Sequence, residues 1–240
     1  DYGQLEGCTA AMCSRDKVLV EALRNDYDIH TEWMHRLVKL YPDWLNGDDI
    51  KDKTIAKHYR SITKNKLVFP AIYGASNDSI ASYLNVPPDI ADDLMDEFWG
   101  IFTGLAHWQT VTMKNYYETG YVSSPTGRRH YYPLTRNQVI NFPVQGVASD
   151  IVCNSMNALS MYASQTGRWE LHPRLNIHDD LTFVVPDDSK SIDEAIQTIY
   201  EVMLTPTYDF INVPLSVEIS TGKNWYEMKE VGKFWSHKDV

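Results

Sequence analysis

Several common features are scarce or absent in this sequence. It contains only three cysteines (Cys8, Cys13 and Cys153), which show neither metal-ligand spacing nor an even set for disulfides. We therefore expect three lone buried thiols and a reducing, cytoplasmic location. No apolar run approaches the ~20 residues that are needed to span a bilayer, which argues against a membrane protein. The opening residues DYGQLEG do not have the charged-then-apolar layout of a secretion signal.

The chain also has few basic residues, 22 against 32 acidic ones, and a net charge of −10. Taken over the whole chain, this balance argues against a nucleic-acid partner, because phosphate binding normally needs a basic surface. The distribution is uneven, however: residues 51–66 (KDKTIAKHYRSITKNK) contain six basic residues and one acidic residue. A local basic strip on an acidic body is compatible with binding a phosphate chain. A hydrophobic content of 43% indicates a globular protein with one large domain or two modest ones.

The hydrophobic periodicity predicts a helical middle flanked by pieces of an antiparallel sheet. We therefore expect an α+β fold with two subdomains, in which the sheet is assembled from both ends of the chain. The expected hairpins cover 120–133, with Ser-Pro-Thr-Gly as the turn, and 174–186, and a last strand covers 215–220. The expected helices cover 4–13, the segments from Asp16 to Arg24 and from Asp28 to Leu40, 51–73, 78–84, 88–102, 105–118, 141–163 and 190–204.

The basic helix expected at 51–73 is the first candidate binding surface. A solvated charged face is the ordinary explanation of a cationic stripe. This stripe lacks acidic i,i+4 partners and leads into the aromatic pair Phe69 and Tyr73. A cationic face that ends in aromatic rings suits a ligand with phosphates at one end and a base at the other. The cations of the stripe are spaced four, three and four residues apart and so share one face: Lys53, Lys57, Arg60 and Lys64.

The segment RLNIHDDLTFVVP at 174–186 is the second candidate. Apolar and polar residues alternate on both sides of His-Asp-Asp, which predicts a β-hairpin with its turn at or near Asp179-Asp180. An ordinary turn is an equally good explanation of two adjacent aspartates, because Asp favours turns. The rest of the chain has to decide between a simple turn and a chemical site.

Six segments, in order along nearly the whole chain, resemble motifs of the family A DNA polymerases, the bacterial DNA polymerase I type. Any one match is weak, but six in the right order are specific. The resemblance implies similarity to the C-terminal palm and fingers portion of such an enzyme. The segments are DYGQLE (1–6, motif A), RSITKNKLVFPAIYG (60–74, motif B), GYVSSPTGRRHYYP (120–133), NFPVQGVASDI (141–151), IHDD (177–180, motif C) and VPLSVEISTGKNW (213–225).

The resemblance implies template-directed DNA synthesis, in which a primer 3′-hydroxyl attacks the α-phosphorus of a dNTP and pyrophosphate leaves. Charge develops on the entering and departing oxygens, and two Mg²⁺ ions ~3.5–4 Å apart can stabilise both. Asp1 and Asp179 are the expected metal ligands, because Mg²⁺ needs few protein carboxylates, provided that they converge. Asp180 is a third catalytic candidate and stands where the family usually has Glu. It is one methylene shorter, so a direct and a water-mediated metal contact both stay open.

The resemblance also assigns residues to the incoming dNTP. Arg60 and Lys64 would hold the triphosphate, with His30 assisting. Phe69 would stack near the incoming base and sugar.

Further residues are implied for the sugar, the template and the primer. Tyr73 would sit by the template base and pair with Glu6. Glu6, with Gln4 nearby in motif A, would select deoxyribonucleotides by filling the space that a 2′-hydroxyl needs. His178 would support the hairpin near the primer end rather than bind metal. The expected contacts to primer–template DNA are Arg128, Arg129, Asn141, Gln145 and His178.

Motif B departs from the family in one spacing. Family members usually place the aromatic residue four positions after the lysine, whereas Phe69 follows Lys64 by five. On an ideal helix five residues turn ~140° from the starting direction, against ~40° for four, so Phe69 would face away from the cations. Pro70 cannot donate the helical hydrogen bond to Lys66, so the helix is irregular there. We predict a single-turn π-bulge within about 64–69 that returns Phe69 to the phosphate side.

The resemblance implies a palm at 1–15, fingers at 16–140 and palm again at 141–240. The family's thumb, its preceding palm strand and any exonuclease domain would lie upstream, and we expect negligible polymerase activity from residues 1–240 alone. That upstream strand should pair with the 174–186 hairpin, so an exposed sheet edge and apolar surface are expected there. The diverged motifs B and C suggest a phage or similar replicon, and so the cytoplasm of a bacterial or phage-infected cell.

Two other functions are compatible with the sequence. A single-subunit RNA polymerase has a similar palm and a similar Arg…Lys…Tyr-Gly helix, but Glu6 and Phe69 favour a DNA polymerase. Comparison of dNTP with rNTP incorporation separates these two. The other alternative is a non-catalytic, polymerase-like DNA-binding fragment, against which the retention of Asp1 and Asp179 argues.

Overall fold

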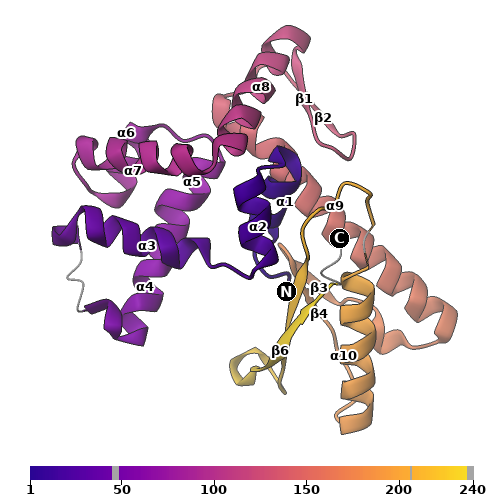
Figure 1. The fold of residues 1–240 in the computed structure, drawn as a ribbon. Helices are drawn as coiled ribbons and strands as arrows, with labels where there is room; N and C mark the ends of the chain where they lie inside the picture. The colour runs from indigo at the N-terminus through magenta and orange to yellow at the C-terminus, as the bar shows by residue number, and fades with distance from the viewer. Residues whose placement is uncertain (45–48, 206, 237–240) are drawn as a thin grey trace. The chain divides into compact units, whose positions relative to one another are not determined.

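The structure is a computed structural model that describes residues 1–44, 49–205 and 207–236. The chain divides into two compact units. Unit 1 consists of Asp1–Met12 and Val144–Val240, and unit 2 of Cys13–Pro143. The helices and strands of both units are drawn in Figure 1. No helix in the described part of the chain is long and apolar enough to cross a membrane.

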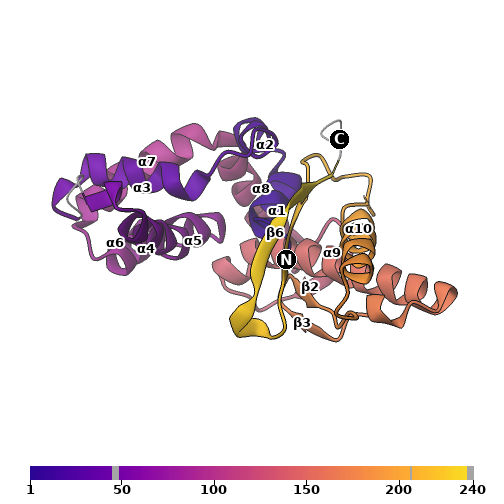
Figure 2. The same ribbon diagram turned by 90° about the horizontal axis from the view of Figure 1, so that it is seen from below.

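Unit 2 is mostly helical. Aspartates at the predicted starts of α2 and α3, Asp16 and Asp28, accept hydrogen bonds from the backbone N–H groups of the first turn, as N-caps do. Figure 2 shows α3 and α7 next to one another, and the rings of Trp33 and Phe98 join them with centroids 4.8 Å apart. The helices are α2 (Lys17–Arg24), α3 (Ile29–Leu40), α4 (Lys53–Thr63), a π-helix (Lys64–Val68), α5 (Phe69–Ile72), α6 (Asn77–Leu84), α7 (Pro88–Ile101) and α8 (Thr103–Thr119), with 3-10 turns at Pro42–Trp44 and Asp49–Lys51.

A single buried carboxylate, that of Asp16, caps the N-termini of two helices of unit 2. Asp16 Oδ1 accepts from the Leu19 N–H at 2.9 Å, at the start of α2, and Oδ2 accepts from the Leu105 N–H at 3.0 Å, in the first turn of α8. Gly104 allows this close approach, because a Cβ at that position would lie 2.8 Å from Asp16 Oδ2 and 2.9 Å from its Cα. The cap of α2 was predictable from the sequence, whereas the second cap depends on tertiary packing.

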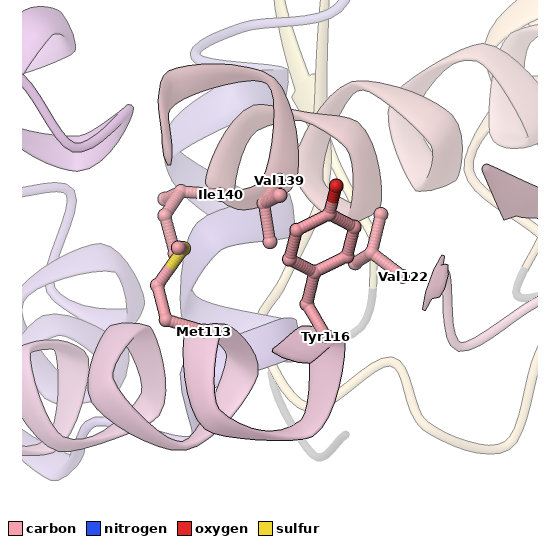
Figure 3. Packing of buried hydrophobic residues seen from close by; sticks show 5 residues of the cluster. All are labelled: Met113, Tyr116, Val122, Val139 and Ile140. Atoms are coloured by element: carbon pink, nitrogen blue, oxygen red, sulfur yellow. The ribbon is translucent and has the colours of Figure 1, made fainter. Parts of the chain in front are cut away.

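A hydrophobic cluster joins α8 to the β1–β2 hairpin (Tyr121–Ser123 and Arg129–Tyr131) and to the first turns of α9 (Arg136–Thr166). Figure 3 shows its buried side chains: Met113, Tyr116, Val122, Val139 and Ile140. Helix α9 begins at Arg136, whereas the sequence analysis placed its start at 141. The missed signal is a capping box, in which the Thr135 N–H donates to Gln138 Oε1 and the Gln138 N–H donates to Thr135 Oγ1.

Unit 1 contains the remaining helices and strands. Strand β5 is central: it pairs antiparallel with β6, and Val217 of β5 pairs with Tyr2, so both ends of the chain contribute to this sheet, as expected. Strand β6 was not predicted. Helix α10 packs on it through the stacked rings of Tyr200 and Phe234, 4.3 Å apart. The elements are α1 (Leu5–Ser14), β3 (Leu175–Ile177), β4 (Asp180–Thr182), α10 (Ser189–Met203), β5 (Ser216–Thr221) and β6 (Lys229–Trp235), with 3-10 turns at Trp169–Leu171 and Trp225–Glu227.

Two expectations about unit 1 and the thiols need correction. The single sheet that we expected is, among the described strands, a set of two-stranded pieces, because β3 and β4 pair only with each other. The hairpin is shorter than 174–186, since its strands are three residues long. The three cysteines are free, but they are not all buried: Cys8 is buried, Cys13 is half-buried and Cys153 is exposed.

Candidate functional site

The helix of motif B contains the predicted π-helical turn. Helix α4 ends at Thr63, the π-helix covers Lys64–Val68, and the Phe69 N–H donates to the Lys64 carbonyl five residues earlier. The prediction of a π-bulge within 64–69 is therefore confirmed. The wider turn absorbs the extra residue between the lysine and the aromatic ring.

The π-helix places three of the predicted dNTP residues together. The Lys64 ammonium lies over the Phe69 ring, 5.2 Å from its centroid, so the two side chains share one side of the helix. The His30 ring meets Phe69 edge-on, with centroids 5.3 Å apart. Tyr73 extends the aromatic end, since its ring is stacked 5.9 Å from that of Phe69.

Arg60 is held in the same site by Asp28. The Arg60 Nε donates to Asp28 Oδ2 at 2.6 Å and Nη2 donates to Oδ1 at 3.0 Å, which is the two-point geometry of an arginine–carboxylate pair. Burial alone would raise the pKa of Asp28, but hydrogen bonds from Arg60 and Thr31 outweigh it and lower the pKa to about 2. Asp28 is therefore ionised at neutral pH and fixes the orientation of the guanidinium.

His30 is a buried polar residue of this site. Its side chain is 3% exposed, and Nδ1 has no hydrogen-bond partner among the described residues. Burial, followed by the positive charges of Arg60 and Lys64, lowers the pKa of His30 to about 4, and the nearby Asp28 opposes the shift. The imidazole is neutral at pH 7 and has an unused buried nitrogen, which commonly marks a place for a ligand atom.

The C-terminal end of the motif B helix is fixed by a buried amide. Gln109 is 2% exposed, and its Nε2 donates to the carbonyls of Ala71 and Ile72, both at 3.0 Å. Arg136 joins this network: Nη2 donates to Gln109 Oε1 at 3.1 Å and Nε donates to the Gly74 carbonyl at 3.3 Å. The last carbonyls of a helix have no partner within the helix, so these bonds fix the position of its end.

In unit 1, Asp1 is positioned by its neighbour Tyr2. The Tyr2 side chain is 2% exposed, and its hydroxyl donates to the Met203 carbonyl and contacts Ser155 Oγ, both at 2.6 Å. Burial raises the pKa of Tyr2 to about 12, although the bond to Ser155 opposes the shift. The Glu218 N–H donates to the Asp1 carbonyl at 2.8 Å, so residue 1 is held against β5.

Asp179 lies at the tip of the β3–β4 hairpin. Ile177 pairs with Asp180, so the turn is His178–Asp179, one residue before the centre that the sequence analysis favoured. His178 adopts the left-handed conformation with a φ of 57°. The Asn176 side-chain amide closes the turn by donating to the carbonyls of His178 at 2.9 Å and Asp180 at 3.2 Å.

The carboxylates of this hairpin lie within electrostatic reach of residue 1, and Figure 1 shows the N-terminus close to it. Within the described part of the chain, no three His, Cys, Asp or Glu side chains come close enough to hold a metal ion together. Among the described residues, Asp1, Asp179 and Asp180 therefore do not form a three-ligand metal site.

The other predicted site residues are distributed over both units. In unit 1, Gln4 and Glu6 are half-buried, whereas Gln145 and His178 are exposed. In unit 2, Arg128 and Arg129 are exposed on the β1–β2 hairpin, and Asn141 is half-buried on α9, where its Oδ1 has no hydrogen-bond partner among the described residues. Glu6 and Tyr73 belong to different units, so their pairing stays a prediction.

Comparison with known proteins matches the family described as DNA polymerase family A to residues 1–227. The chain belongs to this family. Among curated family A relatives, DNA polymerase I of Chloroflexus aurantiacus is 30% identical and that of Bacillus subtilis 27%, each over 95% of the chain. The chain spans about a quarter of their lengths, 24% and 26%. A solved structure, the POL domain of Pol1 from M. smegmatis in complex with DNA primer-template and dNTP, is 25% identical with a TM-score of 0.68, over 85% of this chain and 35% of that one.

Several residues that build these sites in this family A chain were missed by the sequence analysis. Asp28 was assigned only as a helix cap, although it also holds Arg60. Gln109 and Arg136 were not singled out, because a polar residue on a helix is usually solvent-exposed and nothing in the sequence marks its burial. Asn176 could have been considered, since Asn commonly bonds to nearby backbone in turns.

Proposed function

We propose that the chain carries the nucleotidyl-transfer chemistry of a DNA polymerase, adding dNTPs to a primer 3′-hydroxyl as directed by a template. Unit 2 would be the fingers, and unit 1 would be the palm. One observation carries the proposal: Lys64 and Phe69 lie together across a π-helix, beside the ring of His30, whose buried Nδ1 has no hydrogen-bond partner among the described residues. Membership of family A, and a solved relative that holds primer-template and dNTP, support the same assignment.

The triphosphate would bind between Arg60 and Lys64. Asp28 occupies Nε and one Nη2 hydrogen of Arg60, which leaves further N–H donors of the five on the guanidinium for phosphate oxygens. Lys64 adds a compact positive charge on the Phe69 side of the helix. A neutral His30 still has one N–H to donate to a phosphate oxygen. Asp28 thus acts as a positioning residue, which orients Arg60 without meeting the substrate.

The base and sugar would lie toward the aromatic end of the site. Phe69 would stack against the incoming nucleotide, and Tyr73 would contact the template base. Gln109 and Arg136 hold the carbonyls beside Tyr73 and so keep this end of the helix in place. In unit 1, Glu6 with Gln4 would select deoxyribose. Primer–template contacts would come from Arg128, Arg129, Asn141, Gln145 and His178.

Two Mg²⁺ ions fit the chemistry of Asp1, Asp179 and Asp180, which we call the carboxylate end of unit 1. Mg²⁺ binds hard oxygen ligands and usually needs only one or two protein carboxylates besides water and substrate phosphates, so a loose acidic group is sufficient. Asp1 and Asp179 would hold the ions, with Asp180 in direct or water-mediated contact. When bound, such ions stabilise the charge that develops on the attacking and leaving oxygens. The chain's part is to hold these carboxylates on β5 and on the hairpin tip.

The remainder of a full-length polymerase would complete the site. The apolar side chains of β3 are exposed, Leu175 at 41% and Ile177 at 47%, and β3 has no second strand partner among the described residues. A further palm strand would cover this edge. We propose that the chain functions together with such a palm, thumb and exonuclease portion and has negligible primer-extension activity without it.

Primer extension by the full protein tests the proposal. Asp179→Asn should reduce the single-turnover rate by roughly 1000-fold or more, because about 4 kcal/mol of transition-state stabilisation depends on the ions that it binds. Asp187→Asn is the matched control, since Asp187 is an exposed acid of the same unit in a weak ion pair with Lys223. Wild-type protein should incorporate dNTPs in preference to rNTPs. Equal rates for the two variants would show that Asp179 binds no essential metal ion. A lack of primer extension by wild-type protein would indicate a non-catalytic protein, and a preference for rNTPs would indicate an RNA polymerase.

A further inference from the structure

Tyrosine is concentrated in one short part of unit 2. Five of the fifteen tyrosines of the chain lie within residues 116–132, at the end of α8 and on the β1–β2 hairpin. Tyr116 is buried, whereas the exposed fractions of Tyr117, Tyr131 and Tyr132 are 73%, 60% and 70%. The proposed function makes no use of these rings.

The two faces of the hairpin differ in character. Val122 of the Val122–His130 pair is buried in the hydrophobic cluster of Figure 3, and the ring of the exposed His130 contacts that of Phe142 on the same side. Side chains alternate along a strand, so the opposite face carries Tyr121, Tyr131 and Arg129. This is the outward face of the hairpin.

The outward face brings two rings and a guanidinium side by side, with the planes of Tyr121 and Tyr131 tilted by 50°. Tyr121 and Tyr131 are directly opposed across the two strands, with ring centroids 5.7 Å apart. The Arg129 guanidinium lies over the Tyr121 ring at 4.6 Å. The support beneath is rigid, because the Tyr116 hydroxyl accepts from the Leu134 N–H at 2.6 Å and the Tyr132 N–H donates to the Gly120 carbonyl at 2.9 Å.

The charge of the hairpin is opposite to that of the chain as a whole. Arg128 and Arg129 are exposed at its end, while the chain has a net charge of −10. The neighbouring charges on α8 cancel, since Lys114 pairs with Glu118 at 3.8 Å. Exposed aromatic rings next to arginines are the combination that binds single-stranded nucleic acid, through base stacking and phosphate contacts.

We propose that the outward face of the hairpin binds unpaired bases of the template strand. Unpaired bases are the fitting ligand, because bases within a duplex stack on one another and present only their edges. Tyr131 stacks on a base, Tyr121 and Arg129 support and extend the stack, and Arg128 contacts phosphate. The assignment of this strand as template rests on the proposed function, whereas the binding of single-stranded DNA does not.

Fluorescence anisotropy with labelled oligothymidine, and with an abasic oligomer of the same length, tests the surface. Tyr131→Ala should weaken binding of oligothymidine by about 5- to 100-fold, the range for loss of one base–aromatic stack, and leave abasic binding unchanged. Tyr131→Phe should bind as wild type, because it keeps the ring. Arg129→Ala should weaken binding of both oligomers. Tyr117→Ala is the matched control, an even more exposed tyrosine outside this face, and should have no effect.

Two results would overturn the proposal: Tyr131→Ala that binds oligothymidine like wild type, or Tyr117→Ala that loses as much affinity. Primer extension by the full protein separates this failure from failure of the proposed function. If wild-type protein extends primers and Tyr131→Ala keeps full affinity for oligothymidine, the stacking surface is wrong and the polymerase assignment stands. If wild-type protein extends no primer and Tyr131→Ala loses affinity, the surface stands without the polymerase assignment.

Discussion

The cationic site of unit 2 and the carboxylate end of unit 1 are built in different ways. In unit 2 the side chains hold one another: Asp28 binds Arg60, Lys64 lies over Phe69, and His30 meets the same ring. In unit 1 the backbone holds the arrangement, through the pairing of residue 1 with β5 and a closed turn at Asp179.

This difference predicts different responses to mutation. A preorganised cationic site should lose nucleotide affinity when a supporting residue or the helical register changes, because binding geometry is already set by the protein. The carboxylate site should lose catalysis when Asp179 is replaced, with little effect on folding, because strand pairing and the Asn176 side chain hold the turn at Asp179. Changes in the motif B helix and at Asp28 test the expected loss of nucleotide affinity, and Asp179→Asn tests the expected loss of catalysis.

Among changes in the cationic site, a single-residue deletion in the motif B helix should have the largest effect on the KM for dNTP. Deleting Asn65 removes the extra residue of the π-helix, so that the aromatic residue follows Lys64 by four positions, about one turn of an ordinary α-helix. The ring stays on the lysine side, and the KM for dNTP should change by less than about threefold. Deleting Ser61 instead rotates Arg60 relative to Lys64 by about 100° and should raise the KM by roughly 100-fold. Steady-state primer extension with varied dNTP measures both. A similar loss in both variants would show that the register of the π-helix is not what matters.

The support of Arg60 by Asp28 should have an intermediate effect. Asparagine keeps the N-cap of α3, so Asp28→Asn should retain the fold, but it loses the charged two-point contact with Arg60. We expect the KM for dNTP to rise roughly tenfold, since a hydrogen bond to a charged group contributes about 1.5–3 kcal/mol. Asp52→Asn is the control, because Asp52 caps α4. Its KM should stay at the wild-type value, and a tenfold rise there would contradict the role given to Asp28.

The buried imidazole of His30 should also make the stability of the fold depend on pH. The pKa of His30 is about 4, below its ordinary value of 6.5, so the unfolded chain binds this proton more tightly than the folded one. The stability that neutral His30 preserves is fully present above pH 6.5 and is lost as the pH falls through 4, by up to about 3 kcal/mol. The pKa of Asp28, about 2, keeps its contribution outside this window.

Urea unfolding of unit 2 at pH 7 and pH 4.5 measures the stability that is lost when His30 is protonated. His30→Gln should remove most of the loss of stability between the two pH values. His58→Gln, at an exposed histidine of α4, should not change it. Equal pH dependence in wild-type protein and His30→Gln would show that His30 titrates normally.

The sequence was informative where one residue and its spacing decide the structure. The five-residue interval from Lys64 to Phe69 predicted the π-helix, and Asp16 and Asp28 predicted two helix starts. The sequence was less informative where a turn or strand depends on local alternatives: the hairpin turn lies at His178–Asp179, one residue before its predicted centre.

The residues that tertiary contacts select could not be predicted. Gln109 looks like any polar residue on a helix, and only the folded chain places it under the carbonyls of Ala71 and Ile72. Strand β6 was missed because KEVGKFW has little apolar alternation, and it forms by pairing with β5. Periodicity reports local burial, whereas these features depend on partners distant in sequence.

The most direct test of the cationic site is to compare the KM for dNTP of Lys64→Ala with that of Lys66→Ala. The two lysines lie in the same π-helix, but residues two positions apart do not face the same side. We expect Lys64→Ala to raise the KM at least tenfold and Lys66→Ala to leave it within about twofold, because a charge-assisted contact is lost only in the first. Equal KM values for the two variants would contradict the account.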